Sequence, residues 1–93
     1  MVIGLLTLRL HFPESQSLKD KRVVLKSLFD RVRNRFNVSI VEAEDRDLWQ
    51  SSVVVLAHVN TDRSNAESVL QAVLNLLDGE SMLQVVDVET EFL

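Results

Sequence analysis

The stretch NVSIVEAEDRDLWQSSVVVLAHV, residues 37–59, decides the fold. In residues 38–43 the period is two, with Val38, Ile40 and then Glu42 on one side and Ser39, Val41 and Ala43 on the other. Residues 48–59 form a longer segment rich in valine. Alternation of this kind is typical of β-strands, because successive side chains point to opposite faces of a sheet. The polar residues 44–47 between the two segments predict a turn, so the whole stretch predicts a β-hairpin.

Helical periodicity flanks the hairpin on both sides. Before it, Ser17 and Asp20 resemble a capping box, and apolar residues then share one stripe at 100° per residue. That stripe consists of Leu18, Leu25, Leu28, Phe29, Val32 and Phe36. After the hairpin, Asp62 or Ser64 can cap a second amphipathic helix that ends near Gly79.

Two further alternating segments, residues 1–12 and 83–93, complete the pattern. The order strand, helix, strand, strand, helix, strand in so short a chain predicts the α+β, ferredoxin-like βαββαβ fold. Right-handed crossovers place both helices on one face of a four-stranded antiparallel sheet, with the first and third strands central. We expect residues 1–93 to form a single domain.

The composition excludes several kinds of site. The chain has no Cys, which excludes disulfides, a cysteine-based zinc site and a cysteine nucleophile. Its two Gly are too few for a glycine-rich phosphate loop. No apolar run approaches the roughly 20 residues needed to cross a bilayer, and no signal peptide is predicted. We therefore expect a cytoplasmic protein without membrane contact, and no cofactor is predicted.

The face of the sheet that the helices leave open is one candidate functional surface. Parity predicts that odd positions of the first strand and even positions of the third point outward, among them Leu5, Arg9, His11, Val54, Leu56 and His58. Their aliphatic members would need a cover, and a homodimer with two sheets face to face is the simplest one. Arg9 is expected beside Asp87 or Glu89 as a weak cross-strand ion pair.

The same face suggests an alternative function. With the first and third strands parallel, His11 and His58 would meet at one end of the sheet, where two imidazoles could act as acid and base. Two histidines without an assured third ligand make a weak metal site, so no metal is predicted. A small enzyme or ligand-binding protein that uses these two residues remains the alternative.

The charge distribution is uneven, although the formal net charge is only -4. Residues 19–35 hold seven basic residues against two acids, a net charge of +5, whereas residues 64–93 hold six acids and no base. Along one flank of the first helix lie Lys19, Arg22, Lys26 and Arg33; along the other lie Lys21, Arg31 and Arg35. The helix is either a solvated face or a contact for phosphate groups. In the second case the contact residues would be Lys19, Lys21, Arg22, Lys26 and Arg33.

The turn of the hairpin holds four acids, Glu42, Glu44, Asp45 and Asp47, next to the only Trp. Carboxylates this dense could bind a divalent cation, but a solvated turn is the simpler interpretation. Trp49 follows the alternation of the buried residues in the next strand, so we expect it in the core.

Several of these runs together resemble a known family. The runs are SLKDKR at residues 17–22, FNVSI at 36–40, Glu42, and DLWQ at 47–50. They resemble the YlxP-like family of short bacterial proteins, a domain of unknown function, over essentially the whole chain. The resemblance implies a ferredoxin-like fold. Genes of that family tend to lie among genes for translation and ribosome maturation, which implies a role near the ribosome; no catalytic residues are implied.

Other proteins of this topology do not fit. An acylphosphatase needs a Gly-bearing anion loop with an Arg after the first strand, where residues 12–16 read FPESQ. An RNA-recognition motif needs aromatic residues on the open face, where this sequence is expected to have residues such as Arg9, His11 and Leu56. A metallochaperone needs paired cysteines, and this chain has none. We expect a small non-enzymatic binding protein with the ribosome or RNA as partner, through the basic helix. The alternatives are the histidine-based enzyme or ligand binder and a structural homodimer of unknown role.

Overall fold

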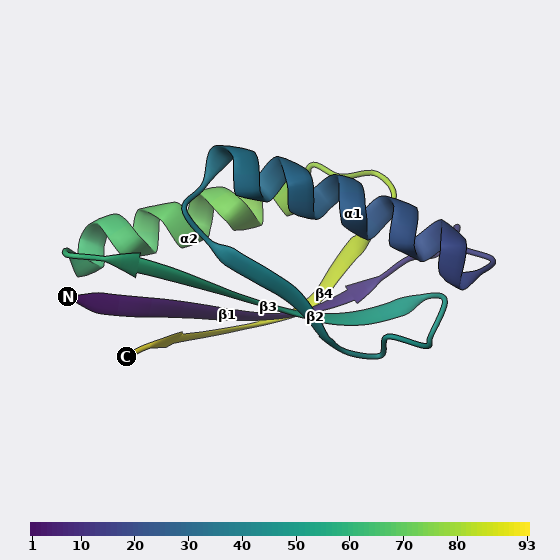
Figure 1. Cartoon of the computed structure of the whole chain (residues 1–93), viewed down its shortest axis with the longest axis horizontal. Helices are drawn as coiled ribbons and strands as arrows, with labels where there is room; N and C mark the ends of the chain where they lie inside the picture. Colours follow the sequence, from purple (N-terminus) through teal and green to yellow (C-terminus); the bar gives the residue numbers. More distant parts are fainter.

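The computed structural model describes residues 1–93 and contains the six predicted elements in the predicted order. Their bounds are β1 (Val2–His11), α1 (Leu18–Arg35), β2 (Ser39–Glu44), β3 (Ser51–Asn60), α2 (Arg63–Asp78) and β4 (Gln84–Phe92). The strands lie in the order β2-β3-β1-β4, with every neighbouring pair antiparallel. Both helices cover one side of the sheet, and the other side is open (Figure 1). The ferredoxin-like α+β prediction is confirmed.

The core lies between the sheet and the helices. On β1, the even positions Leu6, Leu8 and Leu10 are at most 1% exposed, as their alternation predicts. The helices meet them with their apolar stripes, which include the buried residues Leu28 of α1 and Val73 of α2. Full burial of each such side chain contributes about 1.5–3 kcal/mol, so this layer supplies most of the stability.

Side chains cap both helices at their predicted starts. The hydroxyl of Ser17 accepts a hydrogen bond from the Asp20 amide at 3.1 Å. The Asp20 carboxylate in turn accepts from the amide of Gln16 at 3.0 Å, one residue earlier than in a standard capping box. At α2 the cap is Asp62, whose carboxylate accepts from the amide of Asn65 at 2.9 Å. Gly79 ends α2, as expected.

The predicted orientation of β3 is wrong. Leu56 lies opposite Leu6, and Val54 lies opposite Leu8, so both face the helices. His58 shares their face and is 4% exposed. The prediction failed because residues 53–56 are apolar at both parities, so alternation alone cannot say which set is buried. Pairing with β1, whose pattern is unambiguous, decides the matter.

The register of β3 can be tested by two truncations. Leu56→Ala removes a fully buried side chain and should lower the free energy of unfolding by about 2–5 kcal/mol. Val59→Ala, on the open face and 51% exposed, should change it by about 0.5 kcal/mol or less. Urea unfolding curves followed by circular dichroism measure both; a larger loss for Val59→Ala would contradict the register.

Candidate functional site

The structure does not bring the two histidines together. Because β1 and β3 are antiparallel, His11 lies opposite Ser51, whereas His58 lies opposite Gly4 at the other end of β1. At 3.3 Å per residue, the two positions are about 23 Å apart, and they also lie on opposite faces of the sheet. The prediction of a parallel pair of strands with adjacent histidines is therefore wrong.

Each histidine has a local role instead. His58 is buried, and its Nδ1 donates to the carbonyl oxygen of Asn37 at 2.8 Å. Its Nε2 lies 3.2 Å from the side-chain amide nitrogen of Asn60, so both ring nitrogens of this buried histidine have a hydrogen-bond partner. His11 is the last residue of β1, and its Nδ1 donates to the carbonyl oxygen of Gln50 at 2.9 Å.

Lys21 is the residue that the basic-helix prediction placed wrongly. Its side chain is fully buried, not exposed to a phosphate partner. The ammonium lies 2.9 Å from a carboxylate oxygen of Glu42, which is itself only 14% exposed. The ammonium also donates to the carbonyl oxygens of Asp45 at 2.7 Å and Ser51 at 3.1 Å, with Arg46 farther away at 3.4 Å. The three shorter contacts, to Glu42, Asp45 and Ser51, match the three N–H donors of an ammonium, so the buried charge is fully satisfied.

The positions of Lys21 and Glu42 within the hydrophobic patterns of α1 and β2 could have predicted this buried pair. Lys21 precedes Leu25 by four residues and Leu28 by seven, which places it on the buried stripe of α1. Glu42 has the parity of Ile40, which is buried on β2. Only their charges argued for exposure. In the structure the two charges neutralise each other, so both side chains can be buried or nearly buried.

The turn between β2 and β3 is held by a second set of polar contacts. Asp45 has a φ of 63°, a left-handed conformation that Asp tolerates better than most residues. Its carboxylate accepts from the Ser51 hydroxyl at 2.7 Å and lies 3.7 Å from the guanidinium of Arg9. The register does place Arg9 opposite Asp87, as expected, but the ion pair of Arg9 forms with Asp45. No group of three or more His, Asp or Glu side chains lies close enough to hold a metal ion.

Trp49 is exposed, which contradicts its predicted place in the core. It is 55% exposed, and its neighbour Leu48 is 51% exposed. The two lie before β3 begins, in an irregular segment that strand alternation does not describe. With four neighbours they line a hollow of about 450 Å³. The complete lining is His11, Asp47, Leu48, Trp49, Gln50 and Ser51.

Gln50 holds this segment against the rest of the molecule. Its backbone carbonyl accepts from the amide of Phe12 at 2.9 Å and from His11. Its side-chain amide donates to the carbonyl oxygen of Ser15 at 3.1 Å. Trp49 is therefore presented next to a fixed backbone, at the end of the molecule where α1 begins.

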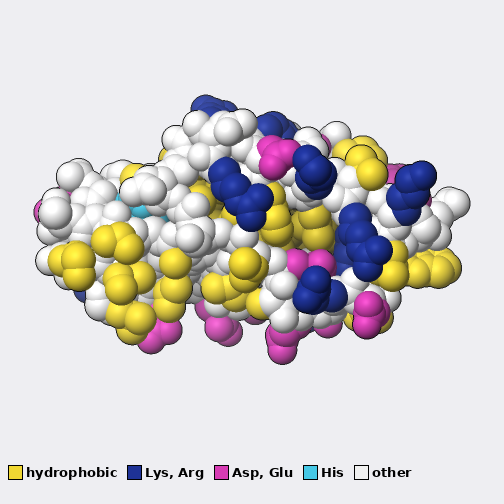
Figure 2. Space-filling view, in the orientation of Figure 1, with side chains coloured by type: hydrophobic (Ala, Val, Ile, Leu, Met, Phe, Trp, Pro, Cys, Tyr) yellow, Lys and Arg dark blue, Asp and Glu magenta, His cyan; other side chains and the backbone are white.

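The remaining basic residues of α1 form an exposed face. Lys19, Arg22, Lys26 and Arg33 are all exposed, and Figure 2 shows the dark blue basic side chains distributed over α1. Lys26 pairs with Asp30 at 3.1 Å, but both side chains are more than half exposed, so this pair is weak. Arg33 donates to the Ile40 carbonyl at 3.0 Å. On the other flank, Arg31 is engaged by Glu80.

The fold and these surfaces define a small α+β domain with a buried Lys–Glu pair and a basic helix. Comparison with known proteins assigns the chain to a family. Residues 3–90 match the family described as "Protein of unknown function (DUF503)", and the chain belongs to that family. It is 39% identical over 79 residues to the uncharacterized protein YlxP of Bacillus subtilis (strain 168), which covers 85% of this chain and 86% of that relative.

Two designed proteins of known structure are similar in fold. Foldit4 has a TM-score of 0.53 and 17% identity, over 99% of this chain and 94% of its own. LFR1 1, a design with a ferredoxin fold, has a TM-score of 0.50 and 11% identity, over 100% of this chain and 84% of its own. These similarities concern the fold alone. Neither α1 nor α2 has the length and apolar character of a membrane-spanning helix.

The buried pair makes a sharp stability prediction. Lys21→Met leaves the Glu42 carboxylate, which is only 14% exposed, without its counter-charge and removes the ammonium donor from the carbonyl oxygens of Asp45 and Ser51, and it should lower the free energy of unfolding by about 3–5 kcal/mol. Lys19→Met removes an exposed charge from the same helix turn and should change it by about 0.5 kcal/mol or less. Denaturant unfolding of both variants checks this. Equal small losses would mean that Lys21 is not a structural residue.

Glu80 gives a prediction about pH. The hydrogen bond from Arg31 holds the pKa of Glu80 below its usual 4.5, although desolvation acts in the opposite direction. A carboxylate with a lowered pKa in the folded state stabilises the protein above its unfolded pKa, and this contribution is lost as the pH falls through the folded value. Arg31 is 45% exposed, so the contribution is at most about 1 kcal/mol.

The measurement is the unfolding free energy of wild type and Glu80→Gln between neutral pH and pH 3. The difference between them should be present at neutral pH, begin to decrease below the usual pKa of glutamate, and be lost as the pH falls through the lowered pKa of Glu80 in the folded state. Glu67→Gln, which breaks the exposed Arg63–Glu67 pair, is the control and should lose about 0.5 kcal/mol or less. A difference for Glu80→Gln that grows on acidification would contradict the assignment.

Proposed function

We propose that this protein is a non-enzymatic binding module whose partner is RNA, in isolation or on the ribosome. The observation that carries the proposal is the exposed basic flank of α1, formed by Lys19, Arg22, Lys26 and Arg33. Phosphate groups dominate the affinity of proteins for nucleic acids, because neutralising them releases condensed counterions. A surface that gathers exposed cations is therefore suited to such a partner.

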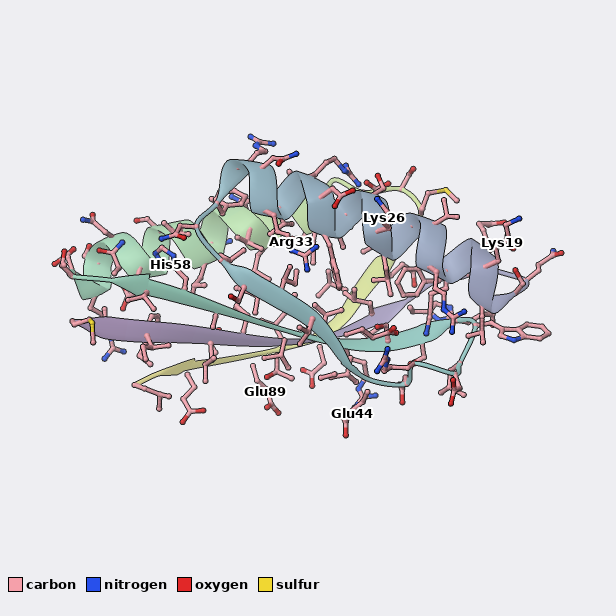
Figure 3. The ribbon with its side chains drawn as sticks, in the orientation of Figure 1. Lys19, Lys26, Arg33, Glu44, His58 and Glu89 are labelled. Atoms are coloured by element: carbon pink, nitrogen blue, oxygen red, sulfur yellow. The ribbon has the colours of Figure 1, made fainter.

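The geometry of the helix supports an extended contact. From Lys19 to Arg33 the helix rises by about 21 Å at 1.5 Å per residue, which is long enough to meet several consecutive phosphates. Figure 3 shows Lys19, Lys26 and Arg33 along α1, on the opposite side of the sheet from Glu44 and Glu89. The formal net charge of -4 thus averages two sides of opposite character.

The exposed Trp49 adds a second kind of contact at the first turn of α1. Ser15, whose carbonyl oxygen accepts from Gln50, lines a small hollow together with Lys19. Trp49 follows on from Gln50, so an aromatic ring and a cation lie at the same end of the molecule. Proteins bind single-stranded RNA by stacking bases on aromatic side chains beside a positively charged track. We therefore propose single-stranded RNA as the partner, with Trp49 stacking on a base.

The test is a titration with single-stranded RNA at several salt concentrations, read out by fluorescence anisotropy of labelled RNA. The triple variant Lys19→Gln, Arg22→Gln, Lys26→Gln should bind more weakly, and the slope of log affinity against log salt should fall by about 2. Quenching of Trp49 fluorescence, which reports on the only Trp, should accompany binding of the wild type.

The control changes the net charge by the same amount elsewhere. Ser64→Glu, Gln71→Glu and Asn75→Glu together add three negative charges to exposed positions of α2. If this control weakens binding as much as the α1 variant, the effect is one of net charge and the basic face is not the site. Absence of RNA binding by the wild type at low salt would refute the proposed function.

A further inference from the structure

The open face of the sheet is a separate surface with its own chemistry. Residues opposite one another in the ladders share a face, so the register arranges this face in rows across β2, β3, β1 and β4. One row is Val41, Val55, Thr7 and Glu89; the next is Ser39, Ala57, Leu5 and Glu91. Aliphatic side chains thus occupy the middle strands, and carboxylates occupy the β4 border.

The aliphatic part continues toward the chain termini. Ile3 lies opposite Val59, and its backbone pairs with Leu93 through hydrogen bonds of 3.0 and 2.8 Å. Val41, Val59 and Leu93 are 56%, 51% and 64% exposed. In Figure 2 hydrophobic side chains gather at the lower left, where Figure 1 places the two termini. A continuous exposed apolar patch of this kind marks an interaction site.

Carboxylates dominate the charge of this face. Asp87, Glu89 and Glu91 of β4 all pair with outward-facing residues of β1, and all three are exposed. Glu44 lies opposite Val53 on the β2 side, and Figure 3 shows Glu44 and Glu89 both projecting away from the helices. Against these four carboxylates the four strands contain one Lys or Arg, Arg9, which already pairs with Asp45.

We propose that the open sheet face docks a basic, partly aliphatic polypeptide segment of another protein. Charge complementarity favours this occupant, because the apolar strip needs an apolar partner and its border needs cations. A hollow of about 440 Å³ shows how the two requirements combine. Leu5 and Val55 line it with Glu89 and Glu91, so the stem of a Lys or Arg can lie on the aliphatic floor while its charge meets the carboxylates.

A second copy of this chain fits the face less well. A face-to-face homodimer would cover the aliphatic strip, but each copy would bring four carboxylates to the contact, and the only Lys or Arg within its strands, Arg9, is already paired. Like charges brought together at an interface oppose association. The open sheet face is also distinct from the basic flank of α1. The proposal of peptide binding and the proposal of RNA binding can therefore be tested independently.

The probe is a short synthetic peptide of alternating lysine and valine, with a lysine–serine peptide and a glutamate–valine peptide for comparison. Amide chemical shifts of the full-length, isotope-labelled protein map where each peptide binds. We expect saturable binding of the lysine–valine peptide with shifts at Leu5, Thr7 and Val55, and much weaker binding of the other two. The double variant Glu89→Gln, Glu91→Gln should lower its affinity roughly five- to tenfold.

Glu67→Gln with Asp78→Asn is the matched control, since it removes two exposed carboxylates from α2 and should leave the affinity unchanged. Equal binding of the lysine–serine peptide, or equal effects of the two double variants, would show unspecific charge attraction and overturn the proposal. Sedimentation velocity tests the homodimer alternative, and we expect the protein to be a monomer. A dimer that Leu5→Glu dissociates would assign the face to a second copy and overturn the proposal as well.

Discussion

The buried ammonium of Lys21 is the constraint on which the arrangement of helix and hairpin depends. Removing a charge from water costs several kcal/mol unless a counter-charge and further hydrogen-bond acceptors compensate it. Here the compensation comes from β2, from the turn and from the start of β3, all of which must converge on one atom of α1. The first turns of α1 and the loop before β3 therefore cannot shift independently. That coupling holds Trp49 in place although the ring itself is exposed.

The same constraint separates the charges of the molecule. Lys21 is the basic residue of α1 that is neutralised inside, so the remaining cations of the helix point to solvent. The acids of β4 point the opposite way, below the sheet. A two-layer domain is thin, and its two outer surfaces are distinct from each other. A polyanion on the helix side and a basic segment on the sheet side would not compete for space, which suits a module that connects two partners.

Periodicity in the sequence was sufficient for the fold but not for the site. The alternation of the four strands and the stripes of the two helices identified all six elements, because burial leaves a pattern at the period of each element. It failed for β3, where Val53 and Val54 are both apolar and only pairing with β1 distinguishes the faces. It failed for Lys21 because a charged residue on a buried stripe is tolerated only with a partner far away in sequence, here Glu42. Trp49 was misplaced because strand alternation was extended into a loop.

The acids of β4 raise the question of whether they serve only to protect an exposed edge strand. Charges do prevent edge-to-edge pairing of sheets, and β4 is an edge. Pairing at an edge, however, runs through backbone groups in the plane of the sheet, so charges on either face would hinder it. Asp87, Glu89 and Glu91 all lie on the open face, while Val88 and Thr90 lie on the other. Edge protection does not explain this one-sided placement, whereas a cationic partner bound across the aliphatic strip does.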